Sequence, residues 1–261
     1  MTKDGSIVFE FTVPAAVVAH GYQEVIKEYA ASAEIKGFRK GKAPVAMVES
    51  SLDKSKVYSH VLEHVIPRAY GQALDAGKYN PVVEPKITPV SMEEGKDWVF
   101  KAETAGRPAI TLGDYKQYIA ADLKKAPKIA KDSQQPAGDQ KLTVALDSLL
   151  KNAQIAVAPI LVEEEAKTSL SKLVNQLGAL KLSVDDYAKS IKKTKDELVE
   201  EYQKTAELNL KVEFLVSEVV KDLEPKVTDA EIAELKPGKG QESYAKYLVQ
   251  KRKALDFLSG L

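Results

Sequence analysis

The chain carries, at residues 37–44, the loop sequence Gly37-Phe38-Arg39-Lys40-Gly41-Lys42-Ala43-Pro44. The two glycines allow the backbone to turn sharply, and Pro44 fixes the φ angle at which a following helix begins. Together with Lys36, this stretch holds four cationic side chains and one aromatic ring, with no acidic residue among them. Such a composition is typical of a docking tip for an acidic, phosphate-rich surface. The alternative is a basic turn whose phenylalanine packs back into the core.

The composition of the whole chain is that of a folded protein. At 261 residues it suits one large or two ordinary domains, and 44% hydrophobic with 29% charged residues argues against extended disorder. The formal net charge is zero, so contact with nucleic acid requires a local basic patch. The absence of cysteine excludes disulfides and thiolate chemistry. Neither a signal peptide nor an apolar run of about 20 residues is evident, so we expect a cytoplasmic protein without membrane contact.

Outward from the loop, the N-terminal part has the pattern of a mixed α+β domain. Alternating apolar residues at 7–11 predict a strand that ends at Pro14, where a helix begins. Apolar residues at three- and four-residue spacing over 57–74 predict a longer helix, which Pro67 should kink or break. Two extended segments that flank residues 93–96 are predicted to pair as a hairpin.

The loop resembles the GFRxGxxP signature of the trigger factor family, the bacterial chaperones of the ribosomal exit tunnel. The resemblance continues through Ile66-Pro67-Arg68-Ala69-Tyr70 and through residues 109–115. It implies that residues 1–113 are a ribosome-binding domain that docks on the large ribosomal subunit, on protein and rRNA near the tunnel exit. The residues to which it assigns docking are Gly37, Phe38, Arg39, Lys40, Gly41, Lys42 and Pro44.

Residues 114–141 are predicted to be a linker, because this segment is rich in Lys and Pro and its middle lacks helical periodicity. Here the chain departs from the family pattern. A typical trigger factor has an FKBP-like prolyl isomerase domain between its other modules, and such a domain needs about 100 residues. The linker has no room for it. We therefore expect a short form of the family that is not an enzyme and needs no cofactor.

Residues 142–261 are predicted to be entirely helical. Pro159 is placed to start a helix, Gly178 to cap its end, and Ser183 to open a short helix by a capping box. A long helix is predicted over 196–223. The stretch 149–162 resembles the first arm of the trigger factor chaperone domain. This resemblance implies an open domain with arm-like helix pairs that shields nascent or unfolded polypeptides without ATP.

The long helix has apolar residues on two sides. A broad face includes Leu208 and Leu215, whereas Leu210 and Phe214 project from nearly the opposite side. A second apolar side indicates either burial between two neighbours or an exposed client-binding surface. The candidate client-binding residues are Ile160, Leu161, Leu210, Phe214, Tyr247, Leu248 and Phe257.

Residues 60–64, His-Val-Leu-Glu-His, match H-x-x-E-H, the inverted zinc-peptidase motif. A zinc site needs a third protein ligand, and His20 is the only other histidine. We therefore predict neither a metal site nor catalytic residues. The alternative to a ribosome-bound chaperone is a ribosome-independent holdase or assembly factor for a specific folded partner. Such a protein has no need of Phe38 and Arg39 in an exposed loop. Client identity and self-association are left open by the sequence.

Overall fold

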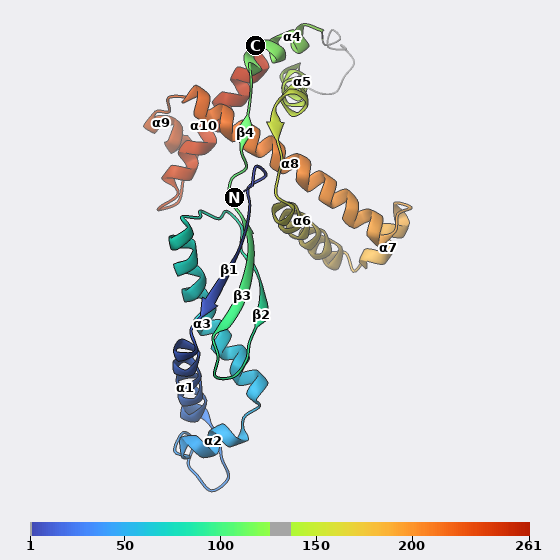
Figure 1. Cartoon of the computed structure of the whole chain (residues 1–261). Helices are drawn as coiled ribbons and strands as arrows, with labels where there is room; N and C mark the ends of the chain where they lie inside the picture. The colour runs from blue at the N-terminus through green and yellow to red at the C-terminus, as the bar shows by residue number, and fades with distance from the viewer. Residues whose placement is uncertain (1, 126–136) are drawn as a thin grey trace. The chain divides into compact units, whose positions relative to one another are not determined.

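The computed structural model describes residues 2–125 and 137–261, which form two compact units (Figure 1). The first unit comprises residues 6–106, and the second combines residues 2–5 with residues 107–261. Each unit has its own buried core. The structural boundary after Gly106 lies a few residues before the domain boundary predicted at 113, and the functional assignment of the two parts stays a prediction.

A three-stranded antiparallel sheet forms one layer of the first unit. Its strand order is β1 (Ser6–Val13), β3 (Trp98–Ala105) and β2 (Lys86–Ser91). Because side chains alternate between the two faces of a strand, Trp98, Phe100 and Ala102 of β3 are buried on the same side. The predicted strand at 7–11 and the hairpin across 93–96 are confirmed, although β2 is shorter than the extended segment that we expected.

Two helices of the first unit, α1 (Ala15–Ser32) and α3 (Lys54–Gly77), pack against this sheet (Figure 1). The short α2 (Val45–Ser51) packs instead against α1, where Val48 joins Ala30 in a separate buried cluster. The predicted starts after Pro14 and Pro44 are confirmed. Val25 and Ile26 of α1 join Val57 and Val61 of α3 in one cluster with the sheet residues, so the two long helices are fixed against each other.

Pro67 does not break α3, which is continuous from Lys54 to Gly77, so the predicted break is wrong, whereas the predicted kink stays a prediction. Proline lacks the N–H that would donate to the carbonyl of Glu63, and a helix-interior proline costs about 3 kcal/mol. On either side of it, however, Val61 and Val65 are buried and Ile66 packs against the same cluster. Burying a valine contributes about 1.5–3 kcal/mol, so the flanking turns offset the loss.

The core of the second unit is a helical bundle. It consists of α4 (Tyr115–Lys125), α5 (Ala137–Asn152), the C-terminal half of α8 (Lys195–Leu223), and α10 (Glu242–Gly260), which follows the short α9 (Asp229–Glu234). Leu149, Leu215 and Leu258 are buried at its centre. A two-residue ladder between β4 (Ile110–Thr111) and β5 (Gln154–Ile155) adds a small second sheet, so the prediction that residues 142–261 are entirely helical is wrong at β5. The α+β class is confirmed.

A separate group of helices in the second unit, here called the arm, comprises α6 (Pro159–Ala179), α7 (Val184–Ser190) and the N-terminal half of α8. Leu173, Leu177 and Leu198 form its core. The predicted start at Pro159 and the cap at Ser183, whose hydroxyl accepts from the Asp186 N–H at 3.1 Å, are confirmed. Among the described residues, no helix is long and apolar enough to cross a membrane.

Two predicted features of the second unit are corrected. Gly178 does not cap α6, because the helix continues through Ala179 and the left-handed residue is Lys181, with φ of 58°. The segment 114–141 is helical at both ends, whereas its middle, 126–136, lies outside the described residues. The linker prediction failed at Tyr115, which is buried and donates a hydrogen bond to Asp222 at 2.7 Å. Burial and this bond raise the pKa of Tyr115 well above its ordinary value.

Candidate functional site

The loop between α1 and α2, here called the tip, has a defined backbone. The Phe38 N–H donates to the Ile35 carbonyl at 3.0 Å, and the Gly41 N–H donates to the Ala33 carbonyl at 3.0 Å. Gly37 and Gly41 have φ of 93° and 71°, a region in which other residues are strained. A Cβ at Gly41 would also lie 2.5 Å from the Ala31 carbonyl oxygen. The chain therefore requires glycine at Gly41 on two independent grounds.

Phe38 is 42% exposed, so the alternative in which its ring packs into the core is wrong. The base of the tip is held by a different set of apolar residues. Ala30, Ala43 and Val48 are buried there, with Ile35 and Leu52 packed against them. Anchoring by these small and aliphatic residues leaves the aromatic ring outside the core.

The cationic side chains of the tip are also exposed. The Lys40 ammonium lies 3.3 Å from the Glu34 carboxylate, but both side chains are largely in solvent, and such pairs contribute at most about 1 kcal/mol. Lys40 can therefore leave this pair for an anionic partner at little cost. In the first turn of α2, Val45 and Met47 are exposed as well. Sequence reasoning missed these two residues, because an apolar pair in a helical turn is usually assigned to the core.

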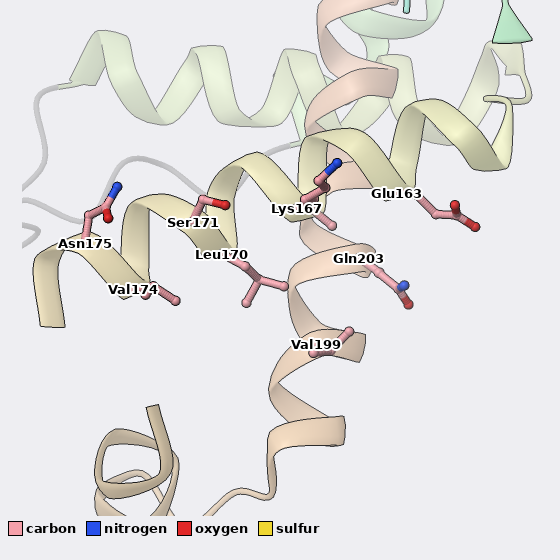
Figure 2. A pocket seen from close by; sticks show the side chains of 9 residues that line it. Glu163, Lys167, Leu170, Ser171, Val174, Asn175, Val199 and Gln203 are labelled. Carbon is pink, nitrogen blue, oxygen red and sulfur yellow. The ribbon is translucent and has the colours of Figure 1, made fainter. Parts of the chain in front are cut away.

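A second candidate surface lies on the arm, between α6 and α8 (Figure 2). Leu170 and Val174 project from the side of α6 that faces Val199 on α8, and polar side chains surround them. Val174 is 50% exposed and Val199 39% exposed. The lining residues are Glu163, Ala166, Lys167, Leu170, Ser171, Val174, Asn175, Val199 and Gln203.

The hollow continues toward the start of α6. A neighbouring hollow shares Glu163 and Gln203 with the first and adds Val157, Pro159 and Val162. We call the two together the arm groove. It exists because the apolar stripe of α6 is wider than its packing partner: Leu173 and Leu177 are buried against Leu198, whereas the adjoining positions are not covered.

The seven predicted client-binding residues lie outside the arm groove. Leu161 is 7% exposed and is therefore a core residue. Ile160, Leu210, Phe214 and Tyr247 are half-buried, and the Tyr247 hydroxyl donates to Glu213 at 3.1 Å. Leu248 and Phe257 of α10 are the most exposed of the set.

The sequence carries a signal for the groove. Leu170 and Val174 share the helical spacing of Leu173 and Leu177, so all four belong to one apolar face of α6. A face of that width exceeds what one neighbouring helix covers, which is the sign of an uncovered stripe. On α8, Leu208 is 52% exposed, although we placed it on the broad packing face. It lies between the part of α8 that packs in the arm and the part that packs in the bundle.

The H-x-x-E-H motif lies on α3, and a third potential ligand, which is not a histidine, lies beside it. Glu28 of α1 brings a carboxylate to the two imidazoles of His60 and His64, with one ligand atom from each within 4.8 Å of the others.

Comparison with known proteins identifies the family. The family model described as "Bacterial trigger factor protein (TF)" matches residues 2–136, and the model of the trigger factor C-terminus matches residues 111–236. The chain therefore belongs to the bacterial trigger factor family, as its loop signature implied. The two matched segments adjoin and overlap, which agrees with a short form.

Individual relatives match over part of their length. A trigger factor of Staphylococcus epidermidis is 28% identical over 168 residues, which are 64% of this chain and 36% of that protein. A trigger factor of Staphylococcus aureus is 31% identical over 140 residues, 54% of this chain and 32% of the relative. The matched part thus spans about a third of these relatives.

A solved structure shares the fold over the full length of the chain. It is described as "Promiscuous Substrate Recognition in Folding and Assembly Activities of the Trigger Factor Chaperone". The TM-score is 0.65 with 11% sequence identity, and the match covers 100% of this chain and 98% of that one. At this identity the match supports the fold and no more.

Proposed function

We propose that this protein is an ATP-independent chaperone that docks on the large ribosomal subunit through its tip and holds nascent or unfolded polypeptides against its arm groove. The observation that carries the proposal is the tip itself. A glycine-fixed backbone presents an exposed ring beside Arg39, Lys40 and Lys42. Cations bind phosphates at low conformational cost when the loop is already ordered, and the ring adds an apolar contact.

The decisive test is co-sedimentation with large ribosomal subunits. The triple variant Phe38→Ala, Arg39→Ala, Lys40→Ala should lose binding while its melting temperature stays that of the wild type, because all three side chains are exposed. A matched control is Tyr244→Ala, Lys246→Ala, Arg252→Ala, which removes an exposed ring and two cations from α10. The control should bind like the wild type. Equal binding by the tip variant would refute docking through the tip.

The arm groove supports the holding function. Its aliphatic side chains offer contact area without a fixed hydrogen-bonding pattern, so they suit many apolar segments, and individually weak contacts allow release without ATP. Val174→Ser with Val199→Ser should weaken the suppression of aggregation of a denatured client several-fold. The matched control is Val8→Ser with Val90→Ser, two exposed valines of the first unit. If both pairs behave alike, the groove is not the holding surface.

A second function, holding or assembling a folded partner without ribosomes, is favoured by the location of the groove. The groove lies wholly in the second unit, whereas the tip lies in the first. If this function is the main one, the tip triple variant keeps full activity in every client assay and in cells.

We assign no prolyl isomerase activity to the chain. The segments that match the N- and C-terminal families overlap over residues 111–136, so no stretch between them holds a domain of about 100 residues. An X-Pro peptide assay should show isomerisation at the uncatalysed rate. Turnover in that assay would contradict the assignment.

A further inference from the structure

A cluster of potential metal ligands lies on α1 and α3 of the first unit. His60 and His64 are four residues apart on α3, which places them one above the other on the same helical face. Their ring centroids are 5.2 Å apart. Glu28 comes from α1, and its carboxylate lies 3.8 Å from His64 Nε2. One ligand atom from each of the three lies within 4.8 Å of the others.

The surroundings do not explain the cluster as ordinary packing. Within the part of the chain that the structure describes, the buried His60 Nδ1 has no hydrogen-bond partner. The Tyr29 ring meets this imidazole in a T-shaped arrangement, with centroids 5.7 Å apart. A buried polar atom without a partner destabilises the fold, so packing alone does not account for this histidine.

We propose that Glu28, His60 and His64 bind a divalent transition-metal ion, with Zn²⁺ as the best-suited ion. Two imidazoles and one carboxylate are ligands that Zn²⁺ accepts, whereas Mg²⁺ and Ca²⁺ prefer oxygen ligands alone. Tetrahedral Zn²⁺ with ligands at about 2.1 Å separates them by about 3.4 Å. Rotation of the side chains alone therefore brings the three ligand atoms from within 4.8 Å of one another to this distance.

The backbones that carry the ligands are already fixed. Val25 and Ile26 of α1 pack with Val57 and Val61 of α3 in the core of the first unit, directly beside the cluster in sequence. A bound ion would therefore join two helices that are held in place, and it would stabilise the first unit. The proposal concerns binding and helix bracing, and it does not depend on the chaperone function.

The chain supplies its own reporter for this site. Trp98 is the sole tryptophan and is buried in the core of the first unit, so its fluorescence follows the unfolding of that unit. In untagged full-length protein, Zn²⁺ at a hundredfold excess over its Kd should raise the melting temperature seen by Trp98 by about 10 °C. Mg²⁺ at the same concentration should leave the melting temperature unchanged. Absence of the Zn²⁺ effect would overturn the proposal.

Affinity measured by calorimetry then tests the ligands one by one. His64→Asn, His60→Asn and Glu28→Gln should each weaken Zn²⁺ binding at least tenfold. His20→Asn is the matched control. His20 Nδ1 lies 3.6 Å from Glu24 in an exposed pair, and among the described residues no third potential metal ligand lies close to both. His64 is partly exposed, so its replacement keeps the fold and gives a clear reading even where His60→Asn destabilises the unit. A loss for His20→Asn equal to that for His64→Asn, or no loss for either, would refute the site.

Discussion

The tip and the arm groove both leave apolar side chains uncovered, but they do so in different ways. The tip concentrates one ring and its cations on a short loop whose backbone is fixed by glycines and by hydrogen bonds. The groove spreads aliphatic side chains over two helices, with glutamate, lysine and amide groups around them. The first arrangement suits a single defined partner, and the second suits many partners of low affinity. The contrast predicts that the two surfaces respond differently to salt, to backbone strain and to loss of apolar contacts.

The largest difference between the two surfaces should be the effect of salt on the binding that each supports. If Arg39, Lys40 and Lys42 each meet one phosphate, raising monovalent salt from about 50 to 200 mM should weaken ribosome binding about 20- to 40-fold. Aliphatic contacts are not screened, so client holding should change by no more than about twofold. Titrations of both activities over the same salt series measure the difference. An equal loss of both activities with salt would contradict the claim that the tip binds through charges and the groove through apolar contacts.

Backbone strain should affect the tip alone. Gly41→Ala keeps every cation, but it forces a Cβ into the left-handed region, at about 1–2 kcal/mol, and against the Ala31 carbonyl oxygen. Ribosome affinity should fall about tenfold, because the docking conformation is no longer the preferred one. Gly37→Ala is the control: it has the same strain with open space around the added Cβ, so its effect should be smaller. A similar loss for both would mean that the close approach at Gly41 is unimportant.

Removing apolar contacts should distinguish an exposed groove from a packed face. Leu210 and Phe214 are half-buried, so Leu210→Ser with Phe214→Ser should lower the free energy of unfolding by about 2–5 kcal/mol. The groove pair Val174→Ser and Val199→Ser should cost less than about 1 kcal/mol and yet reduce holding more. Chemical denaturation and the aggregation assay on both variants give the comparison. A stable Leu210/Phe214 variant with lost holding would return the client surface to that face of α8.

The sequence predicted the tip better than the groove, and the reason is physical. Gly37, Gly41 and Pro44 constrain their own backbone, so a short window holds the information. The exposure of Val174 depends instead on how much of α6 its neighbour covers, which a periodic pattern cannot reveal.

The metal ligands fall between the two cases. His60 and His64 are visible as a helical pair, but Glu28 comes from another helix and joins them only through packing. Tyr115 was missed because its burial depends on distant residues of α8 and α10.

The smallest effect concerns α10, whose exposed Leu248 and Phe257 offer an apolar surface separate from the arm groove. Glu231 of α9 accepts hydrogen bonds from Lys253 of α10, at 3.0 Å, and from the Thr228 N–H. These bonds lower the pKa of Glu231 from 4.5 to about 2. Because the pKa is lower in the folded state, the carboxylate stabilises the fold above pH 4.5, and this contribution is lost as the pH falls toward 2.

Glu231→Gln keeps a capping side chain without the charge, so its stability should be slightly below wild type at pH 7 and equal to it near pH 2. Circular dichroism melts of both proteins across this range measure the difference. A stability difference that is constant with pH would show that the charge of Glu231 does not hold α9 against α10. The aggregation assay on the same variant gives a second result. If client holding weakens when this contact is lost, α10 shares the function assigned to the groove.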